Sequence, residues 1–260
     1  MDIKSISSAL IAGAAAGLIA ALLQLWLVQP VLLHAELYEG GERTHFSAPP
    51  EEGHSHSHDS AAISPDDHAH DQAASTPPSP HQGDAPFSAE IDLKRDALTV
   101  LFSILIYAGY ALLSLAVLLA TTANGRKFAV RDGILWGLGG FLAVQFLPAI
   151  GLAPELPGMS AADLTQRQIW WGATVAASAL GIWLIAFGRN WLSWGLAILL
   201  IAAPHVIGAP HIEVFTGPAP PELASEFASR ALGVGLVGWL VMGLALFALL
   251  FSPPRRIQVQ

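Results

Sequence analysis

Six long apolar segments constrain the fold of this chain more than any other feature. They cover roughly 6–30, 97–120, 132–150, 169–187, 191–207 and 231–251. A helix needs about 20 predominantly apolar residues to cross a bilayer, and a spanning backbone must satisfy its own hydrogen bonds. The sequence therefore predicts an all-α integral membrane protein with six transmembrane helices. Pro204 and His205 interrupt the fifth segment, so five spans with that segment re-entrant stays an alternative.

The predicted organisation has three parts: a first transmembrane helix over 1–33, a polar loop over 34–96, and a membrane domain over 97–260.

Composition and motifs disfavour other classes of protein. Of the residues, 53% are hydrophobic and 12% charged, and there is no cysteine for a disulfide, a thiolate metal site or a cysteine nucleophile. No phosphate-binding loop, zinc-protease or serine-hydrolase motif is present, so no enzyme and no cofactor are predicted. The basic residues are too sparse for a nucleic-acid partner.

Eight of the ten histidines lie in the polar stretch between His34 and His81. Neutral imidazole is a good ligand for late transition metals such as Co²⁺, Ni²⁺ and Zn²⁺, and short histidine tracts indicate metal binding by composition. The stretch has little that could form a core, so we expect it to be mostly disordered without a ligand. The loop is predicted to collect metal through the histidines of two tight repeats: His54, His56, His58, His68 and His70.

Lysine and arginine in short loops predict the orientation, because they favour the cytoplasmic side. With six spans and a cytoplasmic N-terminus, that side receives Lys4, Arg126, Lys127, Arg131, Arg189, Arg255 and Arg256. The opposite side receives Arg43, Lys94, Arg95, Arg167 and Arg230. The balance favours a cytoplasmic N-terminus and places the histidine-rich loop outside.

A second group of polar residues gathers at the predicted outer end of the bundle, next to proline and glycine. Ionisable groups at membrane depth are costly and indicate a pathway or a binding site. We predict a metal site built from His205 and His211, joined by His34, Glu36, Glu155 and Glu213. The alternatives are interfacial histidines and an ion pair between Glu155 and Arg167. Trp170 and Trp171 are predicted to lie in the aromatic belt at the membrane surface.

The interior of the predicted helices offers few polar groups for a metal path: Gln24, Tyr107, Tyr110 and Gln145. Small residues four apart allow helix backbones to approach closely in lipid. Such spacing occurs at Gly13 and Gly17 and recurs at Gly133 and Gly137, with Gly140 nearby. Packing within the bundle is favoured over a subunit interface, and a homo-oligomer stays open.

Three ordered motifs carry a family resemblance: Gly151-Leu-Ala-Pro-Glu-Leu-Pro-Gly158, Arg167-Gln-Ile-Trp-Trp171 and Pro204-His-Val-Ile-Gly-Ala-Pro-His211. Together with a histidine-rich loop after the first span, they resemble the CbtA family of predicted cobalt transporter subunits. The resemblance implies a bacterial inner-membrane protein that takes up cobalt for cobalamin synthesis, with a small single-span CbtB partner.

The predicted function is therefore uptake of a divalent transition metal, with Co²⁺ favoured over Ni²⁺ and Zn²⁺. The alternative is a non-transporting subunit that binds or senses metal for a separate permease. The scarcity of polar groups inside the helices favours that alternative.

Overall fold

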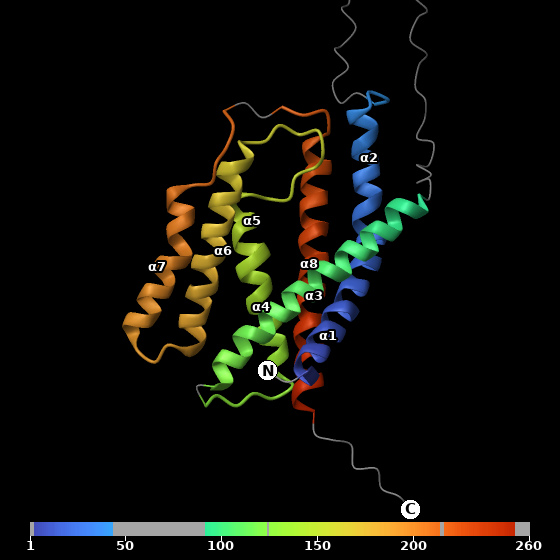
Figure 1. The fold of residues 1–260 in the computed structure, drawn as a ribbon. Coiled ribbons are helices and arrows are strands. Elements are labelled where there is room, and N and C mark those ends of the chain that lie inside the picture. The colour runs from blue at the N-terminus through green and yellow to red at the C-terminus, as the bar shows by residue number, and fades with distance from the viewer. Residues whose placement is uncertain (1–2, 44–91, 124, 214–215, 253–260) are drawn as a thin grey trace, which may run out of the picture. The chain divides into compact units, whose positions relative to one another are not determined.

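The computed structural model describes residues 3–43, 92–123, 125–213 and 216–252, and the regular elements within these ranges are helical (Figure 1). In chain order they are α1 (Ile3–Leu23), η1 (Gln24–Val28), α2 (Gln29–Glu39), α3 (Leu93–Ala123), α4 (Asp132–Phe141), η2 (Leu142–Phe146), α5 (Leu147–Gly151), α6 (Leu164–Phe187), α7 (Trp191–Ile207) and α8 (Pro221–Phe251), where η marks a π-helical turn. The predicted metal-collecting histidines, from His54 to His70, lie outside the described residues.

Within the described ranges, five helical segments are long and apolar enough to cross a membrane. They are Ile3–Glu39, Leu93–Ala123, Asp132–Gly151, Leu164–Phe187 and Pro221–Phe251. The all-α membrane class predicted from the sequence is confirmed. Several helices extend beyond the apolar runs, since apolar length reports only the hydrocarbon thickness and helix ends continue into the headgroup region.

The direction of α7, which has 17 residues, follows from its neighbours. Gly243 of α8 lies beside Gly133, and Gly235 lies beside Gln145, so α8 is antiparallel to the α4–α5 segment. Helix α6 also runs antiparallel to that segment, and hence parallel to α8 (Figure 1). The chain must therefore return along α7 between them. At 1.5 Å per residue, α7 is about 26 Å long, close to the roughly 30 Å of a hydrocarbon core. This geometry favours six passes over a re-entrant α7.

Two glycine seams hold the bundle together. At the first, α1 packs against α3: a Cβ on Gly13 would lie 2.5 Å from Ala108 Cα, and one on Gly17 would lie 2.6 Å from Ile104 Cα. Only glycine permits this approach of two backbones. The prediction that these glycines pack within the bundle is confirmed.

The second seam joins α4 to α8. Gly133 lies against the backbone of Gly243, and Gly137 against the backbone of Trp239. Gly140 makes room for the indole ring of Trp239. The half of the α4–α8 interface that contains the start of α4 is therefore closely packed, from Gly133 to the level of Trp239.

Each of the two kinked spans contains a π-helical turn followed by proline. In the first span η1 precedes Pro30, and in the third η2 precedes Pro148. A π turn and a proline both disturb the regular backbone hydrogen bonds, so freed carbonyls need other donors. Arg230 of α8 supplies one: its Nη1 donates to the carbonyl oxygen of Leu27 at 2.7 Å.

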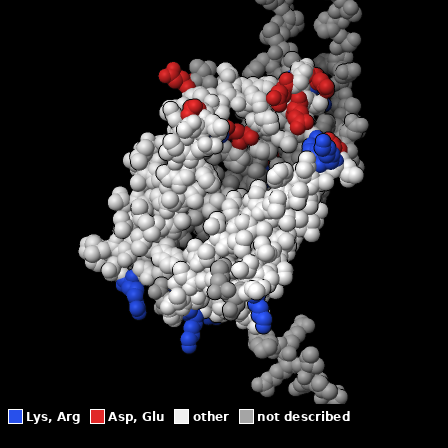
Figure 2. Space-filling model, in the orientation of Figure 1, with Lys and Arg blue, Asp and Glu red and all other residues white. Residues whose placement is uncertain are grey.

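Charge is distributed unequally between the two ends of the bundle (Figure 2). The end that carries the starts of α1 and α4 and the α6–α7 turn bears Lys4, Arg126, Lys127, Arg131 and Arg189, with Asp132 as its carboxylate among the described residues. The described carboxylates of the opposite end are Glu36, Glu39, Glu42, Asp92, Asp96, Glu155, Asp163, Glu213, Glu222 and Glu226. We call this opposite end the acidic end.

Candidate functional site

A cavity of about 520 Å³ lies between α3, η2, α5, α6 and α8. Its polar lining falls into two groups. At the acidic end it is bordered by Glu155, Arg167 and Gln168, and deeper in the bundle it reaches Tyr110 and Gln145. Apolar residues of α5, α6 and α8 line the wall between the two groups. We call this space the uptake cavity. It connects the acidic end with the polar interior.

The inner end of the uptake cavity gathers interior polar residues that the sequence had singled out. Gln145 lies on η2 with its side chain against Gly235, where any larger residue would displace it. Its Oε1 atom is buried and has no hydrogen-bond partner within the described part of the chain. The hydroxyl of Tyr107 donates to the Gly235 carbonyl at 3.4 Å, and Tyr110 stacks on Trp239 with ring centroids 4.7 Å apart. The interior therefore offers an unused oxygen acceptor beside a rigid aromatic group.

An ion pair stands at the mouth of the uptake cavity. Arg167 Nη2 donates to Glu155 Oε2 at 2.6 Å, joining the start of α6 to the loop that precedes it. Asp163 caps the same helix by accepting a hydrogen bond from the Gln166 amide at 3.0 Å. The pairing that the sequence left open for Glu155 is thus observed. The carboxylate keeps a second oxygen and stays partly exposed, so it can still meet a cation from solution.

His205 lies in the last turn of α7, edge-on to Trp170 with ring centroids 5.9 Å apart. Its Nε2 atom is buried without a hydrogen-bond partner among the described residues.

The prediction that Trp170 lies in the aromatic belt at the membrane surface is wrong. Trp170 is only 9% exposed, and its indole nitrogen donates to the Pro204 carbonyl at 3.2 Å. Trp171 is exposed and lines the uptake cavity.

The other predicted ligands lie at the same end of the bundle but in separate surroundings. His211 is exposed, with Nδ1 at 3.2 Å from the Ala209 carbonyl oxygen. His34 Nε2 lies 2.9 Å from Arg43 Nη1. Glu36 and Glu213 are exposed.

Across residues 3–43, 92–123, 125–213 and 216–252, no group of three or more histidine, aspartate or glutamate side chains is placed to hold one metal ion. Metal binding by His205, His211, His34, Glu36, Glu155 and Glu213 stays a prediction.

Sequence reasoning missed three polar contacts in the described helices. Gln29 Nε2 donates to Asp96 Oδ1 at 2.9 Å and ties α2 to α3. Arg230, which binds the Leu27 carbonyl, also pairs with Glu226 one turn earlier on α8. The spacing of Glu226 and Arg230 was a visible signal, since residues four apart share a helix face. The contact between Arg230 and Leu27 had no such signal in the sequence, because it depends on the π turn.

The fold and the cavity define a polytopic α-helical membrane protein with a partly polar cavity within its helical bundle. Comparison with known protein families identifies the family to which the chain belongs. The sequence model of the CbtA family, described as a probable cobalt transporter subunit, matches residues 3–252, and the chain belongs to that family. The description as a subunit implies that the chain works with a partner.

No curated protein and no solved structure matches the chain.

Proposed function

We propose that this chain carries a divalent transition-metal cation, Co²⁺, inward across the bacterial inner membrane. The observation that carries the proposal is the uptake cavity, which is lined by Glu155 and by Gln145. The side-chain oxygen of Gln145 has no hydrogen-bond partner among the residues that the structure describes. A partly buried route with polar groups at both ends is what a conducted ion requires. Membership of the CbtA family, which is described as a probable cobalt transporter subunit, supports Co²⁺ as the metal.

Charge supports the direction. Basic residues in short loops favour the cytoplasmic side of a membrane. The short α3–α4 and α6–α7 connections carry Arg126, Lys127, Arg131 and Arg189. That end is therefore cytoplasmic in our proposal, together with both chain termini. The acidic end then faces outward, where its carboxylates raise the local concentration of cations.

The dimensions of the uptake cavity suit a hydrated ion. Water occupies about 30 Å³ per molecule, so a cation with six waters needs roughly 180 Å³, well below the 520 Å³ available. An ion can therefore pass Glu155 while retaining water and exchange part of its shell for protein oxygens deeper inside. The seam of Gly133 and Gly137 against α8 leaves no such room towards the cytoplasmic end. In our proposal, the cavity near the acidic end and the close packing near the opposite end correspond to an outward-open state.

The histidines are assigned to capture. In our proposal the loop between Glu39 and Leu93, which joins two helix ends on the acidic side, collects metal through His54, His56, His58, His68 and His70. His205 and His211, with His34, Glu36 and Glu213, pass the ion towards Glu155. Because imidazole binds metal only when it is neutral, uptake should weaken as the external pH is lowered. A small single-span CbtB-like subunit is the proposed partner.

The test is the metal content of cells with and without the chain, grown at limiting and at saturating Co²⁺. Cells with the chain should accumulate more Co²⁺ at limiting supply. A variant lacking residues 51–83 should lose that advantage at limiting metal and keep it at saturating metal, because the loop concentrates the ion without forming the path. Equal cobalt content with and without the chain, at verified expression together with its partner, would refute transport.

A second candidate function is a non-transporting subunit that holds metal for another permease. It is favoured by the lack of any three-ligand group among the described residues. The two functions differ at Gln145: Gln145→Leu should abolish uptake by a conducting chain and leave a metal-holding subunit unaffected.

A further inference from the structure

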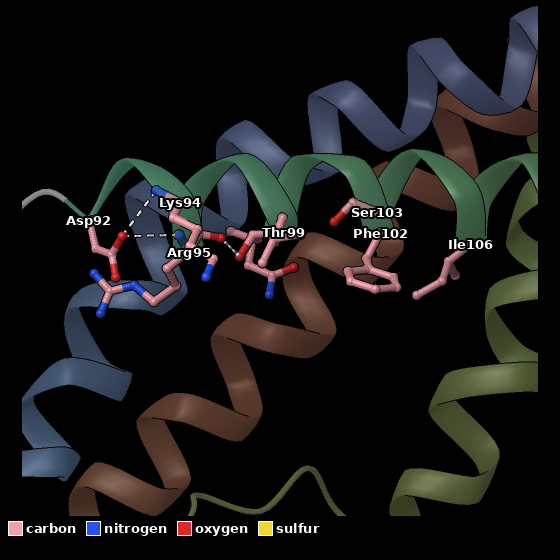
Figure 3. Close-up of a pocket in the computed structure, with 9 residues that line it drawn as sticks. Asp92, Lys94, Arg95, Thr99, Phe102, Ser103 and Ile106 are labelled. Atoms are coloured by element: carbon pink, nitrogen blue, oxygen red, sulfur yellow. Dashed lines mark hydrogen bonds between the residues drawn. The ribbon is translucent and has the colours of Figure 1, made fainter.

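A second cavity, of about 530 Å³, follows the first half of α3 and opens at the surface of the bundle (Figure 3). Apart from Gln24 of η1, all its lining residues come from the segment 92–106. We call it the α3 groove. Its lining shares no residue with the uptake cavity, and none of the predicted metal ligands borders it.

The chemistry of the α3 groove changes along its length. Asp92, Lys94 and Arg95 lie at the start of α3 (Figure 3). The start of α3 belongs to the acidic end. Further along, the lining is dominated by the side chains of Leu98, Phe102 and Ile106. These three residues are between 43% and 58% exposed on a helix that is apolar enough to span the membrane. The groove is therefore ionic at the membrane surface and apolar at membrane depth.

We propose that the α3 groove binds one phospholipid molecule. Its phosphate lies between Lys94 and Arg95, and an acyl chain lies along Leu98, Phe102 and Ile106. Thr99, Ser103 and Gln24 also border the groove. Thr99 lies one helical turn after Arg95 and places a hydroxyl near the level of the ester groups. The inference is independent of metal transport.

The length of the α3 groove suits the acyl chain of a lipid. From Lys94 to Ile106 the axis of α3 rises about 18 Å, slightly more than one leaflet of a roughly 30 Å hydrocarbon core. The lining comes from α3 together with Gln24, so the groove is an open furrow along one helix. An acyl chain of one leaflet has the length to lie along Leu98, Phe102 and Ile106.

Charge selects the phosphate. Lys94 and Arg95 are adjacent cations at an end of the bundle where carboxylates predominate. Arg95 contacts Asp96 at 3.7 Å, while Lys94 is exposed. Asp92 accepts the backbone amides of both residues, at 3.0 and 3.2 Å, which fixes the start of α3 next to the groove. A phosphodiester between the two cations would be neutralised at the depth where lipid headgroups lie.

The first test is native mass spectrometry of the full chain in mild detergent, delipidated and then titrated with phosphatidylethanolamine or phosphatidylglycerol. One molecule of phospholipid should bind per chain, and diacylglycerol with the same acyl chains should bind far more weakly. The double variant Lys94→Gln/Arg95→Gln should lose affinity by on the order of tenfold, since each basic residue near a membrane surface strengthens lipid binding several-fold. The matched control Arg43→Gln removes a cation at the same end outside the groove and should bind as the parent does. Equal binding by the double variant and the parent would overturn the proposal.

A second test does not depend on the charge variants folding. The chain has no cysteine, so Thr99→Cys places one thiol in the groove and Leu105→Cys places one on α3 outside it. Added phospholipid should slow modification of the first thiol by a maleimide and leave the second unchanged. Equal protection at both positions would indicate a general lipid or detergent shell. Protection of Thr99→Cys only in preparations containing a second polypeptide would assign the groove to a protein partner and refute lipid binding.

Discussion

At the mouth of the uptake cavity, Glu155 and Arg167 neutralise each other at 2.6 Å. An ion that meets Glu155 competes with the guanidinium for the same carboxylate. If the Glu155 carboxylate receives metal, replacing Glu155 and replacing Arg167 should have opposite effects on uptake. If the pair only fixes the loop before α6, both removals should have the same effect.

The two substitutions are therefore predicted to change the Co²⁺ concentration for half-maximal uptake in opposite directions. Glu155→Gln should raise the Co²⁺ concentration needed for half-maximal uptake by roughly three- to tenfold, because the mouth loses its anionic ligand while keeping Arg167. Arg167→Gln should lower that concentration, because the carboxylate is freed. The measurement is initial uptake rate against external Co²⁺ at matched expression. Reduced uptake in both variants, accompanied by reduced thermal stability, would reassign the pair to a structural role.

A single histidine makes the second prediction at this scale. The Nε2 atom of His205 is buried without a hydrogen-bond partner in the described part of the chain, and a buried unsatisfied polar atom costs about 1–3 kcal/mol. His205→Leu should therefore raise the melting temperature of the purified chain and, if the imidazole binds metal, weaken uptake at limiting Co²⁺. Unchanged uptake in a stabilised variant would remove His205 from the path. His211→Leu is the matched control for stability, because His211 is exposed and its replacement should leave the melting temperature unchanged.

Among the helices, the glycine seams make the clearest prediction of stability. Gly13→Ala places a Cβ 2.5 Å from a backbone atom of α3, so the two helices must separate. Overpacking of this kind costs roughly 1–3 kcal/mol. Gly109→Ala on α3 adds the same methyl group where no other part of the described structure beyond the adjacent backbone comes within 4 Å. We expect a lower melting temperature in detergent for Gly13→Ala alone. Equal stability of the two variants would mean that α1 and α3 are not packed as described.

How far the sequence predicts the helices depends on which physical property each feature reports. Hydropathy located the spans because lipid requires about 20 apolar residues, yet it missed the polar first turns of α8 that begin at Pro221. The four-residue glycine spacing predicted close packing but not its partner. Neither π turn was foreseen, since a π turn depends on tertiary partners such as the Arg230 side chain that binds Leu27.

For the whole molecule, the sequence identified the end of the bundle where polar residues gather but not the cavity beneath them. Gln145 and Tyr110 were recognisable as polar residues in apolar helices. Their convergence on one cavity with Glu155 follows from how α3, η2 and α6 pack, which no local pattern encodes. The predicted ligand set shares an end of the bundle without forming one group in the described residues. Metal binding by His205 and His211 together stays a prediction.

Topology provides the prediction for the molecule as a whole. With α6 and α8 parallel, six crossings place the α7–α8 connection on the acidic side, outside the cell in our proposal. Single cysteines at Ser57 and Thr216 should then react with a membrane-impermeant maleimide applied to cells with a permeable outer membrane. A cysteine at Ala129, in the basic α3–α4 connection, should react only after lysis, and the absence of native cysteine leaves the parent chain as an unlabelled control.

Each departure from that pattern has a distinct meaning. Labelling at Ser57 without labelling at Thr216 would mean that α7 enters the membrane and returns to the same side. The chain would then have five crossings, and α8 would have to run opposite to α6, against the pairing of Gly243 with Gly133. Labelling at Ala129 alone would turn the acidic end and the mouth of the uptake cavity towards the cytoplasm. An outward-open cavity would become an inward-open one, and the same residues would have to be assigned to metal release or export.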